Sequence, residues 1–598
     1  MRPIAVERCI GGRELTEPRL VADASAVVYA LSVSGVSALM LHPLDGSPVR
    51  QLTAYPPPRT GRALGGGCWC FSADGAAVVY AGADGNLWWQ PIPGGGVRRL
   101  TDLAPDRPAA SPDAAPDGLR IVYTVDQAEV WAVSLTDGAV ERLDDASADF
   151  CLDPAVRPDS TGAVWQAWSV PDMPWDGAYV QAAPFGAGLG TGVGRRAVVV
   201  ADGAVQQLRF MPDGALLAVR DHTGWNNVWL ADTALVDEPF EHAGPTWGAG
   251  QRSFTPSPDG ARVAFTRNEG GFGRLCVVTV ATGEISEVAR GVHGHLHWQA
   301  NSLVAIRTGA RTPTQVVVYD TRTWARTSVA IGPVSGWEDE SLAEPELVEV
   351  TASDGATLFA RLYRADAPTH RLLCWLHGGP TDQWQVTFMP RVAYWRSRGW
   401  NVLVPDHRGS TGHGRVYQQA LVGRWGDLDV TDTTALIAFA HHSGWGDPMH
   451  TVVIGGSAGG FTALGVAGAA PQLLAAAVVS YPVTDLADLA ERSHRFERHY
   501  TDTLVGPLPA AATTYRDRSP VWCADRFTST PLLVLHGDAD PVVPVEQSRT
   551  FAERARAAGA HVELRVYAGE GHGFRQPLNQ LDEYARIDDF LARWVPDQ

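Results

Sequence analysis

A turn phrase that recurs seven times in the first half of the chain limits the fold more than any other feature of the sequence. Each copy precedes a short β-forming run, as Pro116-Asp117-Gly118 precedes LRIVYTV. The copies are centred on Asp23, Asp74, Asp117, Asp159, Asp213, Asp259 and a degenerate Asn301, 42 to 54 residues apart. Proline fixes φ, aspartate caps its own backbone and glycine tolerates positive φ, so the phrase predicts a tight turn before a strand.

Units of about 40–50 residues with one such turn each have the length of four short strands, which is the size of a propeller blade. Seven of them predict a seven-bladed β-propeller closed around a central channel. The alternative is a tandem array of β-sandwiches, which would need an apolar core inside each unit and rarely gives such regular spacing.

The pattern changes near residue 340 into apolar runs separated by amphipathic stretches, which is typical of a parallel sheet covered by helices. The expected strands lie at 372–376, 401–405, 451–455, 475–480, 531–536 and 561–567. The charged, turn-like segment from Gly336 to Ser341 is the expected linker. We therefore predict two domains: the propeller with a short N-terminal extension at 1–335, and a mostly parallel α/β domain with helices on both faces at 336–598.

Charge excludes several classes of function. The 598 residues carry 48 basic and 66 acidic side chains, a net charge of −18, so we expect neither nucleic acid nor an anionic membrane surface as partner. The sequence contains no lysine, so every basic side chain is arginine. This excludes a Schiff-base amine, an anchor for pyridoxal phosphate and a phosphate-loop lysine.

Cysteine usage and hydropathy point to the cytoplasm. The seven cysteines are odd in number and scattered, unlike a disulfide framework, and Cys68-Trp69-Cys70 is one residue too short for a CxxC pair. The first residues show no apolar run of signal-peptide length, and no stretch approaches ~18 uninterrupted apolar residues.

Two motif-like features are expected to have no function. The glycines from Gly188 to Gly194 resemble a dinucleotide loop, but the spacing is wrong and no helix signal follows, so we expect a loop between strands. His293, His295 and His297 alternate as metal ligands on a strand could, but no acidic or cysteine partner is nearby. We expect them on a solvated strand face, and we predict no metal and no cofactor.

A nucleophile elbow is the clearest catalytic signal. Gly455-Gly456-Ser457-Ala458-Gly459 follows the apolar run TVVIG and precedes the helix-like FTALGVAGAA. Small residues on both sides of Ser457 allow a strained strand-to-helix turn that exposes the hydroxyl, and the Ala458 amide can bind developing negative charge.

A serine nucleophile needs a histidine base and a carboxylate that orients it, downstream in the order Ser, Asp, His. Two apolar runs end in loops that supply them, Gly537-Asp538-Ala539-Asp540 and Gly571-His572. Both loops lie at the carboxyl edge of the expected sheet, where open α/β sheets assemble their sites. Asp538 competes with Asp540 for the carboxylate role, and we favour Asp540 with His572. A second oxyanion donor is expected from Gly378 or Gly379 in the turn His377-Gly378-Gly379-Pro380, beside Ala458.

The motifs together resemble one family. A propeller-like first half joined to HGGP, RGSTGHG (408–414), GGSAGGF (455–461), HGDADPVVP (536–544) and GEGHGF (569–574) is similar to the prolyl oligopeptidase family of serine peptidases. Within it, the chain looks most like the bacterial acylaminoacyl-peptidase and dipeptidyl-aminopeptidase-like branch. The resemblance implies an α/β-hydrolase catalytic domain in which Ser457 attacks a peptide carbonyl, His572 moves the proton and Asp540 holds the imidazole.

The same resemblance implies substrate class and specificity. The first specificity pocket would map onto Val483, Leu486 and Val543, next to Tyr481, and would take a hydrophobic or small residue. A propeller that caps the site would admit only short peptides or acyl-peptides, cleaved near the N-terminus.

Three departures from the family pattern weaken a strict dipeptidyl-peptidase assignment. His377 stands where other members place a tyrosine that helps the oxyanion, and Val542 stands where they hold the substrate carbonyl with arginine or asparagine. No pair of glutamates in the first half matches the clamp for a free N-terminus.

Two other functions stay open. The same triad would serve an esterase or amidase acting on small acyl compounds, although the seven-unit half has no purpose in a lone esterase. The chain could instead be a binding scaffold that recruits a protein partner, a role that would not require an intact triad. Edge strands of either domain could pair subunits into a homo-oligomer.

Overall fold

The chain folds into two compact units. The computed structural model describes residues 3–61, 66–92, 94–186 and 203–595. One unit is Arg13–Pro333, and the other combines Met1–Gly12 with Val334–Gln598.

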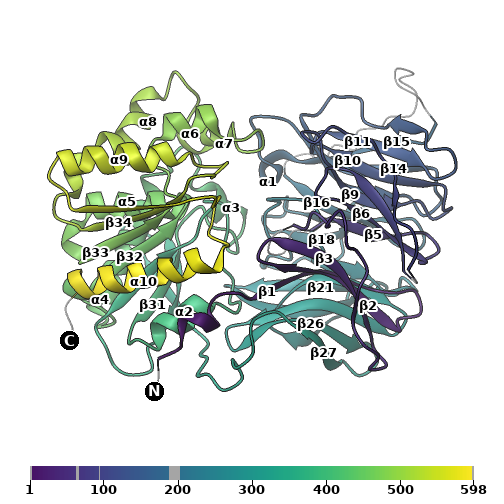
Figure 1. Ribbon diagram of the computed structural model, residues 1–598, viewed down its shortest axis with the longest axis horizontal. Coiled ribbons are helices and arrows are strands. Elements are labelled where there is room, and N and C mark those ends of the chain that lie inside the picture. The colour runs from purple at the N-terminus through teal and green to yellow at the C-terminus, as the bar shows by residue number, and fades with distance from the viewer. Residues whose placement is uncertain (1–2, 62–65, 93, 187–202, 596–598) are drawn as a thin grey trace. The chain divides into compact units, whose positions relative to one another are not determined.

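The unit Arg13–Pro333 is a seven-bladed β-propeller, as predicted. Its strands form seven antiparallel sheets in chain order (Figure 1). The first three sheets contain β1 (Arg13–Leu20), β2 (Ala26–Val33), β3 (Val36–Pro43), β4 (Arg50–Gln51), β5 (Trp69–Phe71), β6 (Ala77–Ala81), β7 (Leu87–Pro91), β8 (Arg98–Arg99), β9 (Ala109–Ala114), β10 (Arg120–Val125), β11 (Glu129–Ser134) and β12 (Val140–Arg142). The other four contain β13 (Phe150–Val156), β14 (Gly162–Trp168), β15 (Tyr179–Pro184), β16 (Val205–Phe210), β17 (Leu216–Arg220), β18 (Asn227–Leu230), β19 (Thr233–Ala234), β20 (Phe254–Pro256), β21 (Arg262–Glu269), β22 (Phe272–Thr279), β23 (Ile285–Arg290), β24 (Val292–Gln299), β25 (Ser302–Gly309), β26 (Thr312–Asp320) and β27 (Ala325–Ile331). A short helix, α1 (Pro174–Gly177), precedes β15.

The apolar core of the propeller lies between sheets. Each pair of neighbouring sheets shares a cluster of buried side chains. The ring closes where Leu15 and Val27 of the first sheet pack against Val304 and Val316 of the seventh. Because an isolated sheet could not bury these faces, the blades are stable only in the closed array, which rules out tandem sandwiches.

The recurrent phrase forms the turn between the first two strands of each blade. At Asp74, Oδ1 accepts a hydrogen bond from the amide of Ala76 at 3.0 Å, and at Asp117, Oδ1 accepts one from Leu119 at 2.9 Å. The glycine of the phrase has a positive φ, 72° at Gly118, which other residues rarely adopt. The repeated phrase therefore corresponds to the turn that joins the first two strands of each blade.

The other unit contains an eight-stranded sheet with helices on both faces, as expected for an α/β hydrolase. In sheet order its strands are β28 (Glu346–Thr351), β29 (Thr357–Tyr363), β31 (Asn401–Asp406), β30 (Leu372–Leu376), β32 (Thr451–Gly456), β33 (Ala476–Ser480), β34 (Leu532–Gly537) and β35 (Val562–Tyr567). The pairs β28–β29 and β29–β31 are antiparallel, and all the others are parallel. The six expected strands correspond to β30 through β35.

Helices cover both faces of this sheet. They are α2 (Pro390–Arg396), α3 (Arg415–Gln419), α4 (Leu428–His442), α5 (Ala458–Ala469), α6 (Leu486–Arg492), α7 (Tyr500–Val505), α8 (Ala512–Arg518), α9 (Val545–Ala557) and α10 (Pro577–Trp594). On one face, α4, α5 and α9 contribute to one apolar cluster, which includes the fully buried Leu464 and Phe551. On the opposite face α10 runs beneath β33 and β34 (Figure 1).

The N-terminal segment corrects the expected domain ranges. The sequence pattern places residues 1–12 with the propeller, but Ile4 packs in an apolar cluster with Trp337 and Ala393 of the α/β unit. Arg8 donates a hydrogen bond of 2.6 Å to the carbonyl of Gly336 and pairs with the carboxylate of Glu340. The expected linker therefore also forms part of this unit, because its buried tryptophan needs an apolar neighbour that the N-terminal segment supplies.

The alternating histidines do not lie on a solvated face. His293 and His295 on β24 are buried, and His295 has a φ of +53° at a β-bulge, which breaks the alternation. His293 contacts the carbonyl of Gly291 at 2.7 Å and the hydroxyl of Tyr319 at 2.8 Å. The glycine run 188–194 lies outside the described residues.

Candidate active site

Ser457 occupies a strained turn between β32 and α5. Its φ of 56° and ψ of −127° are rarely adopted by residues with a side chain. Glycine is required two residues later, because a Cβ on Gly459 would lie 2.5 Å from the carbonyl oxygen of His377. The Ser457 amide donates to the carbonyl of Ser480 at 3.1 Å, which ties the elbow to β33. The turn is thus held on both sides by backbone of neighbouring parallel strands.

Backbone amides lie beside this serine. Ala458 is the first residue of α5, where N–H groups have no partner within the helix. Gly378 lies against the elbow, since a Cβ built on it would be 3.6 Å from Cβ of Ser457. Gly379 has a φ of +118°, and a Cβ there would lie 2.8 Å from the amide nitrogen of Thr381. The turn after β30 can therefore bring backbone, but not side chains, close to the serine.

His377 supports this turn from inside the fold. Its Nδ1 lies 2.7 Å from the carbonyl of Gly378, which can only accept, so Nδ1 carries the hydrogen. Its Nε2 therefore accepts from the hydroxyl of Ser410, also at 2.7 Å. Burial, with a smaller effect of neighbouring His407, lowers the pKa of His377 to about 4. His377 is thus a neutral, fully buried imidazole that holds the turn.

Asp540 and His572 meet at the carboxyl edge of the sheet. The Nδ1 atom of His572 lies 2.7 Å from Oδ2 of Asp540. The other oxygen of Asp540 accepts hydrogen bonds from the amides of Val542 at 2.8 Å and Val543 at 3.0 Å. The competing Asp538 instead accepts from the amide of Gly569 at 2.7 Å. Because Nδ1 of His572 donates to the carboxylate, Nε2 of this ring is the nitrogen left for base chemistry.

A second imidazole, which the sequence did not single out, contacts the same carboxylate. Nε2 of the buried His536 lies 3.5 Å from Oδ2 of Asp540 and 2.9 Å from the carbonyl of Val543. Burial alone would raise the pKa of Asp540, but the hydrogen bonds of His536 and His572 outweigh it and lower this pKa far below its usual range. One signal in the sequence could have found His536: it is the next-to-last residue of β34, directly before the loop that carries Asp540.

The expected specificity residues differ in their access to solvent. Tyr481 follows β33 with a φ of +40°, and its ring centroid lies 4.6 Å from that of His572. Val483 is 2% exposed, whereas Leu486 and Val543 have no exposed surface. A substrate can therefore reach Tyr481 directly, but it can reach the other three only if neighbouring side chains move.

A buried polar network lies behind the glycine turn and was also not predicted. Arg361 and Asp406, both fully buried, form two hydrogen bonds of 2.6 and 2.5 Å. Asp406 also accepts from His413 at 2.8 Å and from Gln383 at 2.7 Å. Burial would raise the pKa of Asp406, but the Arg361 charge and these hydrogen bonds hold it well below its usual range. The network joins β29 and β31 to the loop that carries the glycine turn.

Metal and membrane features are absent from the part of the chain that the structure describes. There, no group of three or more His, Cys, Asp or Glu side chains is arranged to hold a metal ion. None of the helices among the described residues combines the length and apolar content that crossing a bilayer requires.

Known proteins resemble the chain in part of its sequence and in its whole fold. A model of the prolyl oligopeptidase family matches residues 386–598. Dipeptidyl peptidase family member 6 of Caenorhabditis elegans is 29% identical over 255 residues, 42% of this chain and 34% of that protein. The acylamino-acid-releasing enzyme of Arabidopsis thaliana is 28% identical over 226 residues, 36% of this chain and 29% of that enzyme. The chain thus spans about a third of the length of the curated relatives it matches.

A solved structure covers more of the chain. The puromycin-hydrolyzing peptidase of Mycobacterium tuberculosis has a TM-score of 0.91 and 26% sequence identity. The similarity covers 100% of this chain and 97% of that one, so both units have structural counterparts in that protein.

Proposed function

We propose that the chain is a serine peptidase of the prolyl oligopeptidase family, whose model matches residues 386–598, and that it hydrolyses short peptides through an acyl-enzyme intermediate. The observation that carries the proposal is the 2.7 Å hydrogen bond between His572 and Asp540, at the sheet edge that also carries the Ser457 elbow. The three side chains come from three loops that follow three parallel strands. This is the arrangement that a Ser-His-Asp triad needs on an α/β sheet.

In the proposed mechanism, Ser457 attacks the carbonyl carbon of the scissile bond while His572 takes its proton through Nε2. The resulting imidazolium is stabilised by Asp540, whose lowered pKa keeps the carboxylate ionised near neutral pH. His572 then protonates the leaving amine, and a water molecule hydrolyses the ester on Ser457 by the same steps in reverse.

The oxyanion would be bound by backbone amides. Ala458, at the start of α5, supplies one donor, and Gly378 or Gly379 supplies the second. A preorganised donor of this kind contributes about 10²–10³ in turnover. The neutral His377 takes no direct part, because both of its nitrogens are used inside the fold. The proposed oxyanion site is therefore made of main chain alone.

For the substrate, we propose a peptide or acyl-peptide cleaved near its N-terminus, with Tyr481 bordering the reacting group. The names of the relatives favour acylaminoacyl and aminoacyl substrates, and that of the M. tuberculosis neighbour adds puromycin, an aminoacyl amide. Val483, Leu486 and Val543 are the proposed walls of the first specificity pocket, opened by side-chain movement. An esterase or amidase acting on small acyl compounds is the second candidate, because the same triad cleaves both bonds.

Labelling and substrate profiling test the proposal. A fluorophosphonate should label the protein on Ser457, and Ser457→Ala should remove the label while thermal unfolding is unchanged. Acetyl-aminoacyl, free aminoacyl and dipeptidyl anilides, puromycin and a simple acyl ester are then compared by kcat/KM. Higher values for the amides than for the ester support a peptidase. An equal label on Ser457→Ala would contradict the mechanism, and hydrolysis of the ester alone would favour the second candidate.

We also propose a cytoplasmic location, which the seven free thiols support, and a role without nucleic acid, which the net charge of −18 supports. Cell fractionation with an antibody against the protein tests the location. Light scattering after size-exclusion chromatography tests whether the chain forms a homo-oligomer.

A further inference from the structure

The first strands of five blades contain a β-bulge in which one residue has a φ between 50° and 59° and the ladder register shifts next to it. These residues are Glu17, Ser111, Asp153, Gln207 and His295. In the first four of these bulges, the residue two positions further on lines a cavity of the propeller: Arg19, Asp113, Ala155 and Arg209. A bulge re-aims the side chains that follow it, so this repeated irregularity builds the cavity wall.

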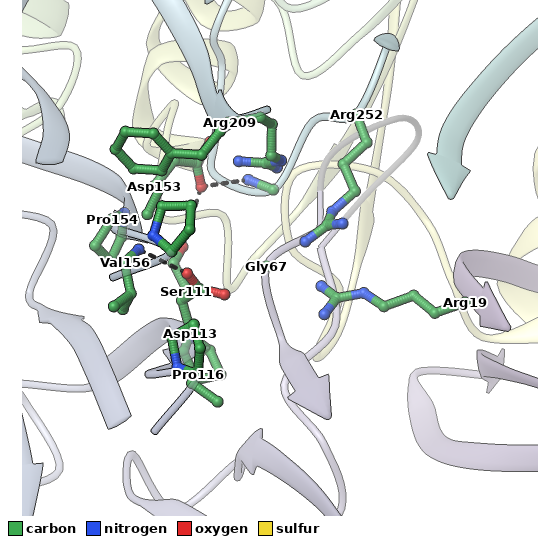
Figure 2. A pocket seen from close by; sticks show the side chains of 16 residues that line it. Arg19, Gly67, Ser111, Asp113, Pro116, Asp153, Pro154, Val156, Arg209 and Arg252 are labelled. Atoms are coloured by element: carbon green, nitrogen blue, oxygen red, sulfur yellow. Dashed lines mark hydrogen bonds between the residues drawn. The ribbon is translucent and has the colours of Figure 1, made fainter. Parts of the chain in front are cut away.

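Three arginines converge on this cavity of about 310 Å³. Arg19 comes from β1, Arg209 from β16, and Arg252 from the segment before β20. Figure 2 shows the guanidinium groups of Arg19 and Arg252 pointing into the same space, with Arg209 entering from a neighbouring strand. Burial, together with the like charges of Arg19 and Arg209, lowers the pKa of Arg252 well below its usual range. Three like charges are thus held around one space, which an anion would relieve.

The nearby carboxylates do not pair with these arginines. Glu17 accepts from the amides of Gly67 at 2.9 Å and Cys68 at 3.1 Å. Asp113 accepts from the amide of Val156 at 2.8 Å, and Asp153 from that of Gly250 at 2.7 Å. Within the described residues, no carboxylate oxygen lies within 4.0 Å of a guanidinium nitrogen of the three arginines. These carboxylates attract the arginines through space, but each of them accepts hydrogen bonds from backbone amides and, in the part of the chain that the structure describes, none is in direct contact with a guanidinium group.

Two of the guanidinium groups have unused donors. Arg19 is 7% exposed, its Nε is buried without a partner, and its side chain makes no hydrogen bond within the described residues. Its guanidinium group lies over the ring of Trp69, 4.6 Å from the centroid. Arg252 likewise makes no side-chain hydrogen bond within the described residues, whereas Arg209 donates to two backbone carbonyls. A buried guanidinium without acceptors is costly, so the site is built for a ligand that brings acceptor oxygens.

We propose that this cavity binds a small oxyanion between Arg19 and Arg252. The planar guanidinium fork matches a phosphate or a carboxylate through paired N–H···O bonds. The cavity has the size of the smaller ligand pockets in proteins, enough for inorganic phosphate or for the C-terminal end of a short peptide. If the ligand is free phosphate, this proposal is independent of the proposed peptidase activity. If the ligand is the carboxylate of a peptide, the proposal rests on that activity.

Calorimetric titration of the full-length protein with inorganic phosphate is the primary test. Binding to one site is expected, and Arg19→Gln and Arg252→Gln should each weaken it by about tenfold or more, because each removes charged hydrogen bonds. Arg252→Lys, which keeps the charge but loses the fork, should fall between them and the native protein. Arg322→Gln is the matched control, since this arginine is exposed and pairs with Asp320 on the surface. Thermal unfolding and near-ultraviolet circular dichroism verify that each variant is folded.

A second arm identifies the source of the oxyanion. In Ser457→Ala protein, which cannot hydrolyse it, an acetylated tripeptide with a free carboxylate is compared with the same peptide as its amide, in competition with phosphate. Displacement by the acid but not by the amide assigns the site to a peptide terminus, and displacement by neither assigns it to a free oxyanion. The proposal is overturned if neither phosphate nor the acid peptide binds, or if both arginine variants fold and bind as tightly as the native protein. A native protein that shows peptidase activity but binds neither phosphate nor the acid peptide would refute this site alone.

Discussion

The buried imidazole of His536 and the carboxylate of Asp540 are 3.5 Å apart, and the contact involves the same oxygen that receives the hydrogen bond from His572. Nε2 of His536 also lies 2.9 Å from the carbonyl of Val543, so this nitrogen carries the hydrogen, and Nδ1 accepts from the hydroxyl of Ser548 at 2.7 Å. His536 thus presents an N–H to the same carboxylate oxygen that His572 contacts. The position of Asp540 is therefore set by its loop amides and by a second histidine, before any substrate binds.

The pairing of His572 with Asp540 predicts unequal effects of two neighbouring substitutions. Asp540→Asn should lower kcat by about 10⁴, because an amide no longer holds the imidazole in the required tautomer. Asp538→Asn should leave kcat nearly unchanged, because the Asp538 side chain accepts a hydrogen bond from the amide of Gly569 and, within the described residues, none from His572. Steady-state kinetics on the best anilide substrate measures both. Equal losses in the two variants would contradict the assignment.

His536 is predicted to be a positioning residue. His536→Phe should lower kcat by about tenfold to a hundredfold with little change in KM, because a displaced Asp540 misorients His572 while the substrate site is intact. His536→Asn, which can still donate toward the carboxylate, should recover part of the loss. Comparison of kcat and KM in the two variants separates positioning from a purely structural role. A folded His536→Phe protein with the kcat of the native protein would rule this role out.

The elbow predicts a steric requirement at Gly459. Gly459→Ala should abolish most activity and destabilise the fold by about 1–3 kcal/mol, because the new Cβ would lie 2.5 Å from the carbonyl oxygen of His377. Gly468→Ala, in the same helix, is the control, since its Cβ would meet its nearest neighbour at an ordinary 3.5 Å. Denaturant unfolding and fluorophosphonate labelling give the two readouts. If both alanine variants behaved alike, the close approach of α5 to the glycine turn would not matter for function.

The buried His377 predicts a loss of stability in mild acid. Its pKa in the folded protein is about 4, below the ordinary value of about 6.5, so the unfolded chain takes up the proton first as the pH falls. The stabilisation from the neutral imidazole is therefore complete above pH ~6.5 and lost as the pH falls through about 4, on the order of 3 kcal/mol in total. The free energy of unfolding, measured with urea at a series of pH values, should fall less steeply with decreasing pH in His377→Gln than in the native protein.

The exposed His442→Gln variant serves as the control for this pH series. The pH dependence of its free energy of unfolding should match that of the native protein, because the buried imidazole of His377 is still present. If His377→Gln also kept the native slope, titration of His377 would not contribute to acid unfolding.

Much of the architecture could be predicted because it depends on local signals. The phrase around Asp117 forms its turn when the carboxylate accepts a hydrogen bond from the amide two residues later. Because this turn is local, counting the phrases gives the number of blades without knowledge of how the blades pack. The parallel strands were predictable from their apolar runs, since both faces of the sheet are covered. The elbow at Ser457 and the loops with Asp540 and His572 follow such runs directly, so their shared edge followed from the direction of the strands.

Other features depend on which distant segments meet. The packing of Ile4 against Trp337, the burial of His293 on a strand and the contact of His536 with Asp540 each join groups whose sequence neighbourhoods carry no sign of the partner. The burial of Leu486 and Val543 likewise depends on how separate elements pack.

The sequence by itself therefore determined the two kinds of domain, the seven blades, and the serine and histidine of the candidate triad, because turns, strands and the order of loops are encoded within a few residues. Only the tertiary structure decided which carboxylate contacts His572, how that carboxylate is held, and that Arg19, Arg209 and Arg252 surround one cavity. The burial of a side chain, the charges around it and its hydrogen-bond partners depend on which distant segments pack together, and these segments meet only when the propeller and the sheet have formed.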